Sequence, residues 1–289
     1  MPMIDRKLTG PKPKTQMPKG ACDTQMHMYL PGYAWREDGK GVPAEPLPTP
    51  DMYRKAMDWL GIDRVVITQG NGHHMDNSSL LACVAEMGDC ARGVAVITGE
   101  TPDAETLRLS EGGIVGARIM DLPGGAVGLD QLEAVDARAH AAGWMMAVQF
   151  DGTALPDLEP RLARLKSNWV LDHHGKIFGG ITPAHVASIK RLIDGGNCWF
   201  KFAGCYEATT TSGPDYPDIA ALSREIGAHA PERIVWGTNW PHNHASRTED
   251  YPDDAHLLDL AMSWLPDQAA QRQVLVETPQ ALYGFPQIT

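Results

Sequence analysis

The stretch ACDTQMHMY, residues 21–29, places three polar side chains that can take part in chemistry at alternate positions: Asp23, Gln25 and His27. If the stretch forms a β-strand, successive side chains point to opposite faces, so these three are expected to share one face. An acid, an amide and an imidazole are groups that transfer protons and form hydrogen bonds. The pattern therefore indicates a polar site on the first strand.

Polar side chains also follow most of the later apolar segments of the chain. Burying so many polar groups is costly unless they bind a ligand or one another, so they are expected to meet at one place. Histidine, amide or charged residues end six further segments: Gln69, Asn71, His73 and His74; Arg118 and Asp121; Gln149 and Asp151; Asp172, His173 and His174; Lys201 and Tyr206; Thr238, Asn239 and His242.

The segments that carry these residues predict the fold. Helical patterns lie between them, and Thr-Pro pairs at 49–50, 101–102 and 182–183 are typical helix starts. Eight strands alternating with helices favour a (β/α)8 TIM barrel, an α/β fold whose active site lies at the carboxyl ends of its strands. The predicted strands are 21–29, 64–70, 92–97, 116–122, 144–150, 168–175, 198–204 and 233–240.

The alternative fold is a doubly wound open sheet. Such a sheet is expected to carry a glycine-rich phosphate turn after its first strand, and the first strand here is followed by MYLPGYAWRED and a proline-rich stretch. We therefore predict a single barrel domain over residues 21–289. The Pro- and Lys-containing residues 1–20 are predicted to form a mobile arm.

Composition narrows the possible partners. The 289 residues are 43% hydrophobic, enough for a sizeable core, and the net charge of −11 disfavours binding to nucleic acid or anionic lipid. The sequence has no apolar run of about 18 residues and no apolar leader segment, so neither a membrane span nor a signal peptide is expected. Its five cysteines, an odd number without C-x-x-C spacing, suggest reduced thiols in the cytoplasm.

Four motifs carry a resemblance to a known family. They are D-x-x-x-H at 23–27, L-D-H-x-G at 171–175, K-F-A-G at 201–204 and G-T-x-W-P-H at 237–242. Together they resemble the amidohydrolase superfamily, in the branch that contains 2-pyrone-4,6-dicarboxylate lactonase. Within this branch, ACDTQMHMYLPGY, GIDRVVITQGN and TNWPH are most similar to lactone isomerases that act on sugar diacids.

Two departures from the metal-binding members of the superfamily stand out. Gln25-Met26-His27 replaces their H-x-H, and Asn239 replaces the Asp that closes strand 8. Only His27 and His173 remain as metal-ligand types, whereas a catalytic zinc requires three protein ligands. We therefore predict no catalytic metal and no other cofactor. The missing acid also removes the usual base for activating water.

The resemblance implies metal-independent isomerisation of a sugar diacid lactone, D-galactaro-1,5-lactone to D-galactaro-1,4-lactone. The substrate's own 4-hydroxyl attacks the lactone carbonyl, and such intramolecular attack can be worth about 7–11 kcal/mol over a bimolecular step. We predict His27, His173 and Asn239 as catalytic residues. Either His173 or His27 takes the proton from the 4-hydroxyl, and the other histidine, or His242, returns it to the leaving oxygen. Asn239 and Gln25 donate hydrogen bonds to the carbonyl oxygen.

The remaining predicted site residues bind the substrate. Arg118 matches an arginine that the family uses at a carboxylate, and Lys201 is a weaker candidate because it can instead pair with Asp121 or Asp151 inside the barrel. His242 is expected to face the site, whereas the acids after it, such as Asp254, are expected in a solvated loop and helix start. The predicted substrate-binding set is Gln25, Asn71, Arg118, Gln149, Lys201 and His242.

Three other functions remain open. The first is a lactonase that hydrolyses the same kind of lactone. The second is a barrel that binds a sugar acid without turnover, although so many titratable residues exceed what a binder needs. The third is a metalloenzyme with an unusual site built on His27, His173 and His242.

Overall fold

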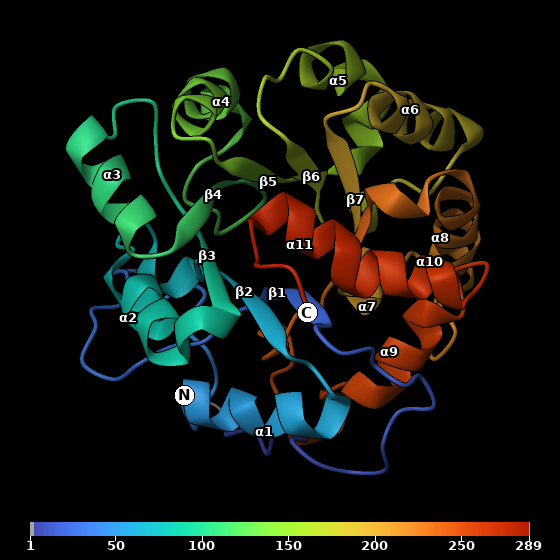
Figure 1. Cartoon of the computed structure of the whole chain (residues 1–289), viewed down its shortest axis with the longest axis horizontal. Coiled ribbons are helices and arrows are strands. Elements are labelled where there is room, and N and C mark those ends of the chain that lie inside the picture. Colours follow the sequence, from blue (N-terminus) through green and yellow to red (C-terminus); the bar gives the residue numbers. More distant parts are fainter. Residues whose placement is uncertain (1–2, 289) are drawn as a thin grey trace.

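Eight strands pair in parallel, each with the next strand along the chain, in the order β1 to β8 (Figure 1). The structure, a computed structural model, describes residues 3–288. The buried strands are rich in Val, Ile and Met on both faces, as expected for a parallel sheet covered by helices. They are β1 (Cys22–Met26), β2 (Arg64–Thr68), β3 (Ala91–Ala95), β4 (Ile114–Asp121), β5 (Met145–Phe150), β6 (Trp169–Leu171), β7 (Cys198–Phe202) and β8 (Ile234–Trp236).

The segment after β8 joins the sheet to its first strand. Met26 forms a parallel bridge with Trp240, the Asn239 amide donates to the Gln25 carbonyl at 2.8 Å, and the His27 amide donates to the Trp240 carbonyl at 2.8 Å. These bonds close the sheet into a ring, which confirms the predicted (β/α)8 barrel.

Helices pack around the barrel between successive strands (Figure 1). As predicted, Thr49 caps α1 and Thr182 caps α6, whereas α3 begins one residue later than predicted, with Pro102 at its N-cap. The helices are α1 (Pro50–Leu60), α2 (Ser78–Met87), α3 (Asp103–Glu111), α4 (Leu132–Ala141), α5 (Leu155–Leu162), α6 (Pro183–Asp194), α7 (Cys205–Ala208), α8 (Pro217–His229), α9 (Asp254–Met262), α10 (Gln268–Arg272) and α11 (Thr278–Tyr283).

The core has two parts. The larger fills the space between the sheet and the helices, and the smaller fills the inside of the barrel. At the amino-terminal end of the strands, Tyr283 and Phe285 pack against Cys22, Val66 and other inward-facing residues. Figure 1 shows α10 and α11 crossing this end of the barrel. A site can therefore open only at the opposite end.

The arm that precedes β1 lies against the surface. The amides of Lys14 and Thr15 donate to the carboxylate of Asp259 on α9 at 2.9 and 2.7 Å, and the Trp59 indole on α1 donates to the Pro11 carbonyl at 2.9 Å. The mobility of this arm stays a prediction.

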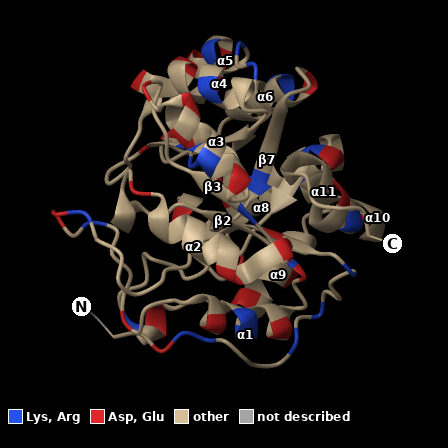
Figure 2. Cartoon of the chain, turned by 60° about the vertical axis from the view of Figure 1, so that its left-hand side comes forward, with Lys and Arg blue, Asp and Glu red and all other residues tan. Residues whose placement is uncertain are grey.

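Charged residues lie mainly on the outer helices and loops, where basic and acidic positions are interspersed (Figure 2). Within residues 3–288, no helix is long and apolar enough to cross a bilayer. The charged residues inside the barrel, away from this surface, therefore need a separate explanation.

Candidate active site

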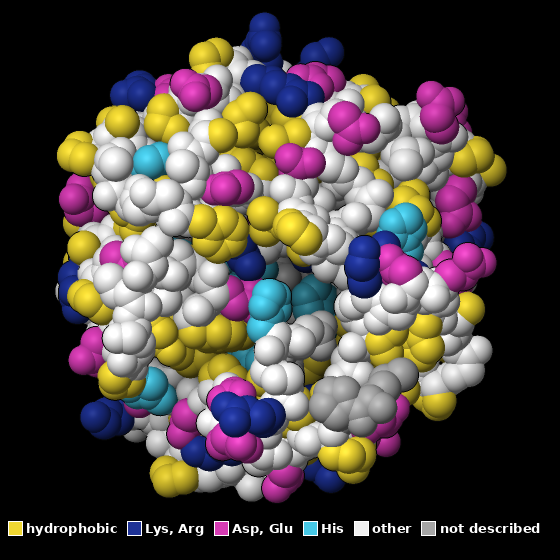
Figure 3. Space-filling model, turned by 180° about the vertical axis from the view of Figure 1, so that it is seen from behind, with side chains coloured by type: hydrophobic (Ala, Val, Ile, Leu, Met, Phe, Trp, Pro, Cys, Tyr) yellow, Lys and Arg dark blue, Asp and Glu magenta, His cyan; other side chains and the backbone are white. Residues whose placement is uncertain are grey.

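A cavity of about 400 Å³ opens at the carboxyl ends of the strands. Figure 3 shows a hollow near the centre of this face, with histidine, basic and acidic side chains around it. A larger groove between the N-terminal arm and α9 contains none of the predicted site residues. The cavity lining includes six of the nine predicted site residues: His27, Asn71, Arg118, Gln149, His173 and Asn239.

His27 follows β1 and is held in one tautomer. Its Nδ1 lies 2.8 Å from the carbonyl oxygen of Thr68, and because a carbonyl can only accept, Nδ1 carries the proton. Nε2 is then the basic nitrogen. Burial and the nearby Arg118 charge lower the pKa of His27 to about 4, so the ring is neutral at neutral pH. It is therefore able to accept a proton.

His173 follows β6 and is arranged in the same way. Its Nδ1 lies 3.2 Å from the Ala203 carbonyl and must be the donor, so Nε2 is again the basic nitrogen. Burial, followed by the charges of Lys176 and Lys201, holds the pKa of His173 well below its usual value. The cavity thus contains two neutral imidazoles, each fixed by a backbone carbonyl.

The backbone around His173 has an unusual conformation. His173 itself has a φ of +49°, and the segments after the strands contain further non-glycine residues with positive φ. Such conformations cluster at functional sites, where the surrounding structure holds them in place. Gly204, with a φ of +58°, has no room for a side chain, because a Cβ would lie 2.9 Å from His173 Nδ1 and 3.1 Å from Asn239 Nδ2.

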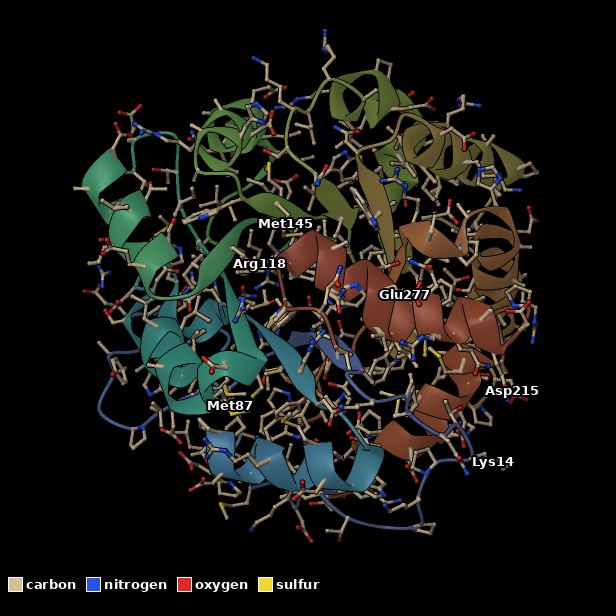
Figure 4. All side chains as sticks on the ribbon, in the orientation of Figure 1. Lys14, Met87, Arg118, Met145, Asp215 and Glu277 are labelled. Atoms are coloured by element: carbon tan, nitrogen blue, oxygen red, sulfur yellow. The ribbon has the colours of Figure 1, made fainter. Side chains whose placement is uncertain are left out.

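Arg118 on β4 is a buried cation without an acidic partner. Its side chain extends inside the ring of helices (Figure 4) and donates to the Gln69 carbonyl at 2.8 Å and to Asn71 Oδ1 and Gln149 Oε1 at 3.1 Å. Nε has no hydrogen-bond partner, and within residues 3–288 no carboxylate forms an ion pair with this guanidinium. Burial lowers the pKa of Arg118, since the charge is poorly solvated. A ligand carboxylate would supply the missing counter-ion.

Asn239 follows β8, and its amide nitrogen is fully engaged. Nδ2 donates to Tyr206 Oη and to Glu207 Oε1, both at 2.9 Å. A carboxylate can only accept, so the nitrogen must face Glu207. Both N–H groups are therefore used, and Oδ1 is the atom that remains for a ligand. The expectation that Asn239 donates to the substrate carbonyl does not fit this arrangement.

Glu207, on the short helix α7, is a site residue that the sequence predictions missed. Its Oε2 accepts from Lys176 Nζ at 2.7 Å, and the two side chains are 7% and 5% exposed. Burial raises the pKa of Glu207, but the charges of Lys176 and His244 and the hydrogen bonds from Lys176 and Asn239 outweigh burial, so the pKa is lowered overall. Both residues line the cavity as an ion pair. Their positions just after β7 and just after His173 were the available sequence signal.

His242 lies one layer behind the cavity wall, contrary to expectation. Its Nε2 donates to Asp254 Oδ1 at 3.0 Å, so Nδ1 is the acceptor for the Tyr206 hydroxyl at 2.6 Å. Burial holds the pKa of Tyr206 well above its usual value, so the hydroxyl keeps its proton. Asp254, expected in solvent, is buried at the start of α9. A hydrogen-bonded chain from Asp254 to Asn239 results.

Gln25 and Lys201 are also behind the wall. Lys201 Nζ lies 2.9 Å from Gln25 Oε1 and 2.7 Å from Asp172 Oδ1, and all three side chains are fully or almost fully buried. Lys201 therefore forms an ion pair inside the barrel, as the predicted alternative proposed, but its partner is Asp172. The expected partners Asp121 and Asp151 instead accept backbone hydrogen bonds in loops.

The prediction that Asp23 shares a face with Gln25 is wrong. The register of β1 against β2 shifts between Asp23 and Met26, and such a bulge re-aims the side chains beside it. Asp23 accepts hydrogen bonds from Tyr53 on α1 and from Thr238, both at 2.5 Å, whereas Gln25 contacts Lys201 inside the barrel.

The donor set does not fit a metal ion. Gln25 Oε1 faces the ammonium of Lys201, and a cation bound between Gln25 and Asp172 would meet that charge. In the part of the chain that the structure describes, no group of three or more His, Cys, Asp or Glu side chains is placed to hold a metal. We therefore derive no step through a metal.

Comparison with known proteins defines the class. A family model described as amidohydrolase matches residues 22–285, and the chain belongs to this family. It is 58% identical over 285 residues to a D-galactarolactone isomerase from Agrobacterium fabrum, covering 98% of this chain and 97% of that protein.

Two further relatives place the chain within the family. It is 28% identical to a 2-pyrone-4,6-dicarboxylate hydrolase from Comamonas testosteroni, covering 94% of this chain and 92% of that protein. A ligand-free crystal structure from Agrobacterium tumefaciens has a TM-score of 0.95 and 57% identity, covering 98% of this chain and all of that one.

Proposed function

We propose that this protein isomerises a sugar diacid lactone, D-galactaro-1,5-lactone, to the 1,4-lactone by acyl transfer within the substrate. The C1–O4 bond forms, the C1–O5 bond breaks, and one proton passes from O4 to O5, so no water is consumed. The observation that carries the proposal is the pair of neutral imidazoles, His27 and His173, that line one cavity with a fixed tautomer each. The 58% identity to a D-galactarolactone isomerase supports it.

Substrate binding depends on the free carboxylate at C6. Arg118 is a buried guanidinium without an acidic partner among the described residues, and it lies on the cavity wall. Charge-assisted, bidentate binding of a carboxylate by arginine is both strong and directional. Asn71 and Gln149 hold the guanidinium through their side-chain oxygens, so they position Arg118 in addition to lining the cavity.

Proton transfer requires one acceptor and one donor. In this scheme Nε2 of either His27 or His173 takes the proton from the 4-hydroxyl, and the proton returns to the leaving O5. A positioned general base contributes typically about 10²–10⁴-fold. Lys176 Nζ, with one N–H on Glu207, has further N–H groups to donate to the carbonyl oxygen as charge develops there. Asn239 Oδ1 accepts a substrate hydroxyl.

Hydrolysis is the second candidate, since the chain is 28% identical to lactone hydrolases of the family. A hydrolase would need a base for water, and Glu207 is the carboxylate on the cavity wall. One of its oxygens accepts from Asn239 and the other from Lys176, and its pKa is lowered. Both of its oxygens are thus engaged by protein donors, whereas the hydrogen bonds of His27 and His173 to backbone carbonyls use Nδ1 and leave Nε2 for a substrate hydroxyl. This arrangement favours isomerisation.

The experiment is NMR of freshly prepared D-galactaro-1,5-lactone with chelator-treated enzyme, following the ring carbons with time. The proposal expects the 1,4-lactone before any open diacid. His27→Gln and His173→Gln should each slow the reaction by about 10²–10⁴-fold. His229→Gln, at an exposed surface pair with Asp194, is the matched control and should retain activity. Direct formation of the diacid would indicate a lactonase, and binding without turnover would indicate a sugar-acid binder.

A further inference from the structure

The cations that line the cavity differ in whether an acidic side chain balances their charge. Lys40 lies at the mouth, is 67% exposed at its side chain, and pairs with Asp38 at 3.4 Å. Lys176 is buried and pairs with Glu207 at 2.7 Å. Among the described cations that line the cavity, Arg118 is the one without an acidic partner. The interior of the cavity therefore offers one uncompensated positive charge.

The Glu207–Lys176 pair is neutral as a unit. Both side chains are nearly fully buried, and the lowered pKa of Glu207 keeps its carboxylate ionised at neutral pH. The ammonium can still donate a hydrogen bond to an uncharged carbonyl, but its charge is already balanced. A ligand carboxylate placed beside Lys176 would lie close to the Glu207 carboxylate, and like charges brought together in a desolvated site repel strongly.

We propose that Glu207 is a specificity-determining residue that restricts the cavity to ligands with one free carboxylate, by balancing Lys176 and repelling a second carboxylate. This inference rests on the proposed function, because an aldaric acid lactone has one free carboxylate and its hydrolysis product has two. The same property separates the proposed substrate from a dicarboxylate such as that in the name of the Comamonas testosteroni relative. In this protein the open diacid is excluded by charge.

Glu207 has a second contact that the test must separate from its charge. Its Oε1 accepts from Asn239, so any substitution also changes the amide that lines the cavity. Glu207→Gln keeps the shape and an oxygen acceptor for Asn239, but removes the negative charge and frees Lys176. Adding Lys176→Met removes the freed cation and leaves the Asn239 contact as in Glu207→Gln.

The experiment is isothermal titration calorimetry at neutral pH with two probes that share a carbon skeleton. D-galactaro-1,4-lactone has one carboxylate, and galactarate, the open diacid, has two. Wild type is expected to bind the lactone at least about 100-fold more tightly than galactarate, because like-charge contact is costly. Glu207→Gln should tighten galactarate binding at least about tenfold, and Glu207→Gln with Lys176→Met should abolish that gain. Glu225→Gln, at the exposed Lys190–Glu225 pair, makes the same charge change away from the cavity and should alter neither affinity.

Two results would overturn the proposal. The first is a wild type that binds galactarate as tightly as the lactone, because it then does not discriminate by charge. The second is an unchanged ratio of lactone to galactarate affinity in Glu207→Gln, because residues other than Glu207 then cause the discrimination. Turnover is measured separately in the wild type. If the wild type shows the expected affinities for lactone and galactarate but no isomerisation, the proposed function is wrong and the role of Glu207 stands. If the wild type isomerises the lactone but Glu207→Gln leaves the ratio of the two affinities unchanged, the role of Glu207 is wrong and the proposed function stands.

Discussion

Asn239 donates its side-chain amide to Glu207 Oε1 at 2.9 Å, and this bond joins the segment after β8 to the helix after β7. It fixes which end of the Asn239 amide faces a ligand, and it occupies one oxygen of the carboxylate that lines the cavity. Asn239, which stands where metal-binding members of the superfamily have an Asp, thus also restrains the carboxylate of Glu207. Lys176 occupies the other oxygen of Glu207 at 2.7 Å.

Replacing Asn239 by Asp tests this relationship. Two carboxylates about 3 Å apart cannot both ionise, so the pKa of one is raised. A group whose pKa is raised in the folded state stabilises the fold at low pH, and that stability is lost as pH rises. Asn239→Asp should therefore lower the thermal midpoint relative to wild type more at pH 8 than at pH 5, measured by calorimetry.

A double variant provides the control for that result. Glu207→Gln removes the second carboxylate, so adding it to Asn239→Asp should remove most of the extra loss at pH 8. A loss in Asn239→Asp that is equal at both pH values, or unchanged by Glu207→Gln, would show that the two side chains are not coupled through charge.

Arg118→Met tests the carboxylate site. The guanidinium has neutral partners only among the described residues, so its main electrostatic partner is expected to be the ligand. Losing one member of a buried, hydrogen-bonded charge pair typically costs about 2–5 kcal/mol, which corresponds to a rise in KM of roughly 30-fold or more. Arg191→Met, at an exposed pair with Glu159, is the control. Steady-state kinetics that show an unchanged KM for Arg118→Met would contradict the assignment.

The pH dependence of activity follows from the buried imidazoles. The pKa of His27 is lowered to about 4, and that of His173 is held well below its usual value. Both rings are then neutral down to moderately acidic pH, whereas an ordinary histidine takes up a proton near pH 6.5. We expect kcat/KM to stay constant from pH 8 to about 5 and to fall below that. An acidic limb centred near pH 6.5 would mean that the base is a solvated imidazole.

Gly204→Ala tests how tightly the site is packed. Alanine at a φ of +58° is strained, by about 1–2 kcal/mol, and its Cβ would also press on His173 and Asn239. Gly143→Ala, at a φ of +71°, brings the strain without the contact, because among the described residues no atom beyond its own chain neighbours lies within 4 Å of the added Cβ. Gly204→Ala should lose more stability than Gly143→Ala in denaturant titrations, because it adds a steric contact to the same strain, and only Gly204→Ala should also lower kcat, by about tenfold or more. Equal kcat values in the two would show that the contact has no effect.

The strands could be predicted from the sequence because buried parallel strands are apolar on both faces and recur at a regular spacing. The polar residues at their ends marked the cavity, and His27, His173 and Arg118 reached it as expected. The sequence could not predict in the same way whether an inward-facing polar side chain reaches the cavity or stays buried inside the barrel. Gln25 and Lys201 point into the barrel, but their mutual contact and Asp172 place them below the cavity.

Glu207 was missed for a different physical reason. In the sequence, a single acid in a loop resembles a solvated surface charge. The left-handed turn at Gly204 and the short helix α7 place Glu207 at the carboxyl end of the barrel, and the sequence pattern did not reveal either feature. Its partner Lys176 comes from the segment after another strand, 31 residues earlier. Asp23 was misassigned because a single bulge reverses the alternation on which the prediction depended.

The most direct test of the proposed chemistry is isomerisation in ¹⁸O-labelled water, with mass spectrometry of the 1,4-lactone at early times. Acyl transfer within the substrate uses only the substrate's own oxygens, so the product should carry no ¹⁸O above the enzyme-free control. Incorporation of ¹⁸O into the 1,4-lactone at the rate of its formation would mean that the ring opens by hydrolysis and then recloses. That result would contradict an isomerase in which His27 and His173 move a proton between two oxygens of one substrate.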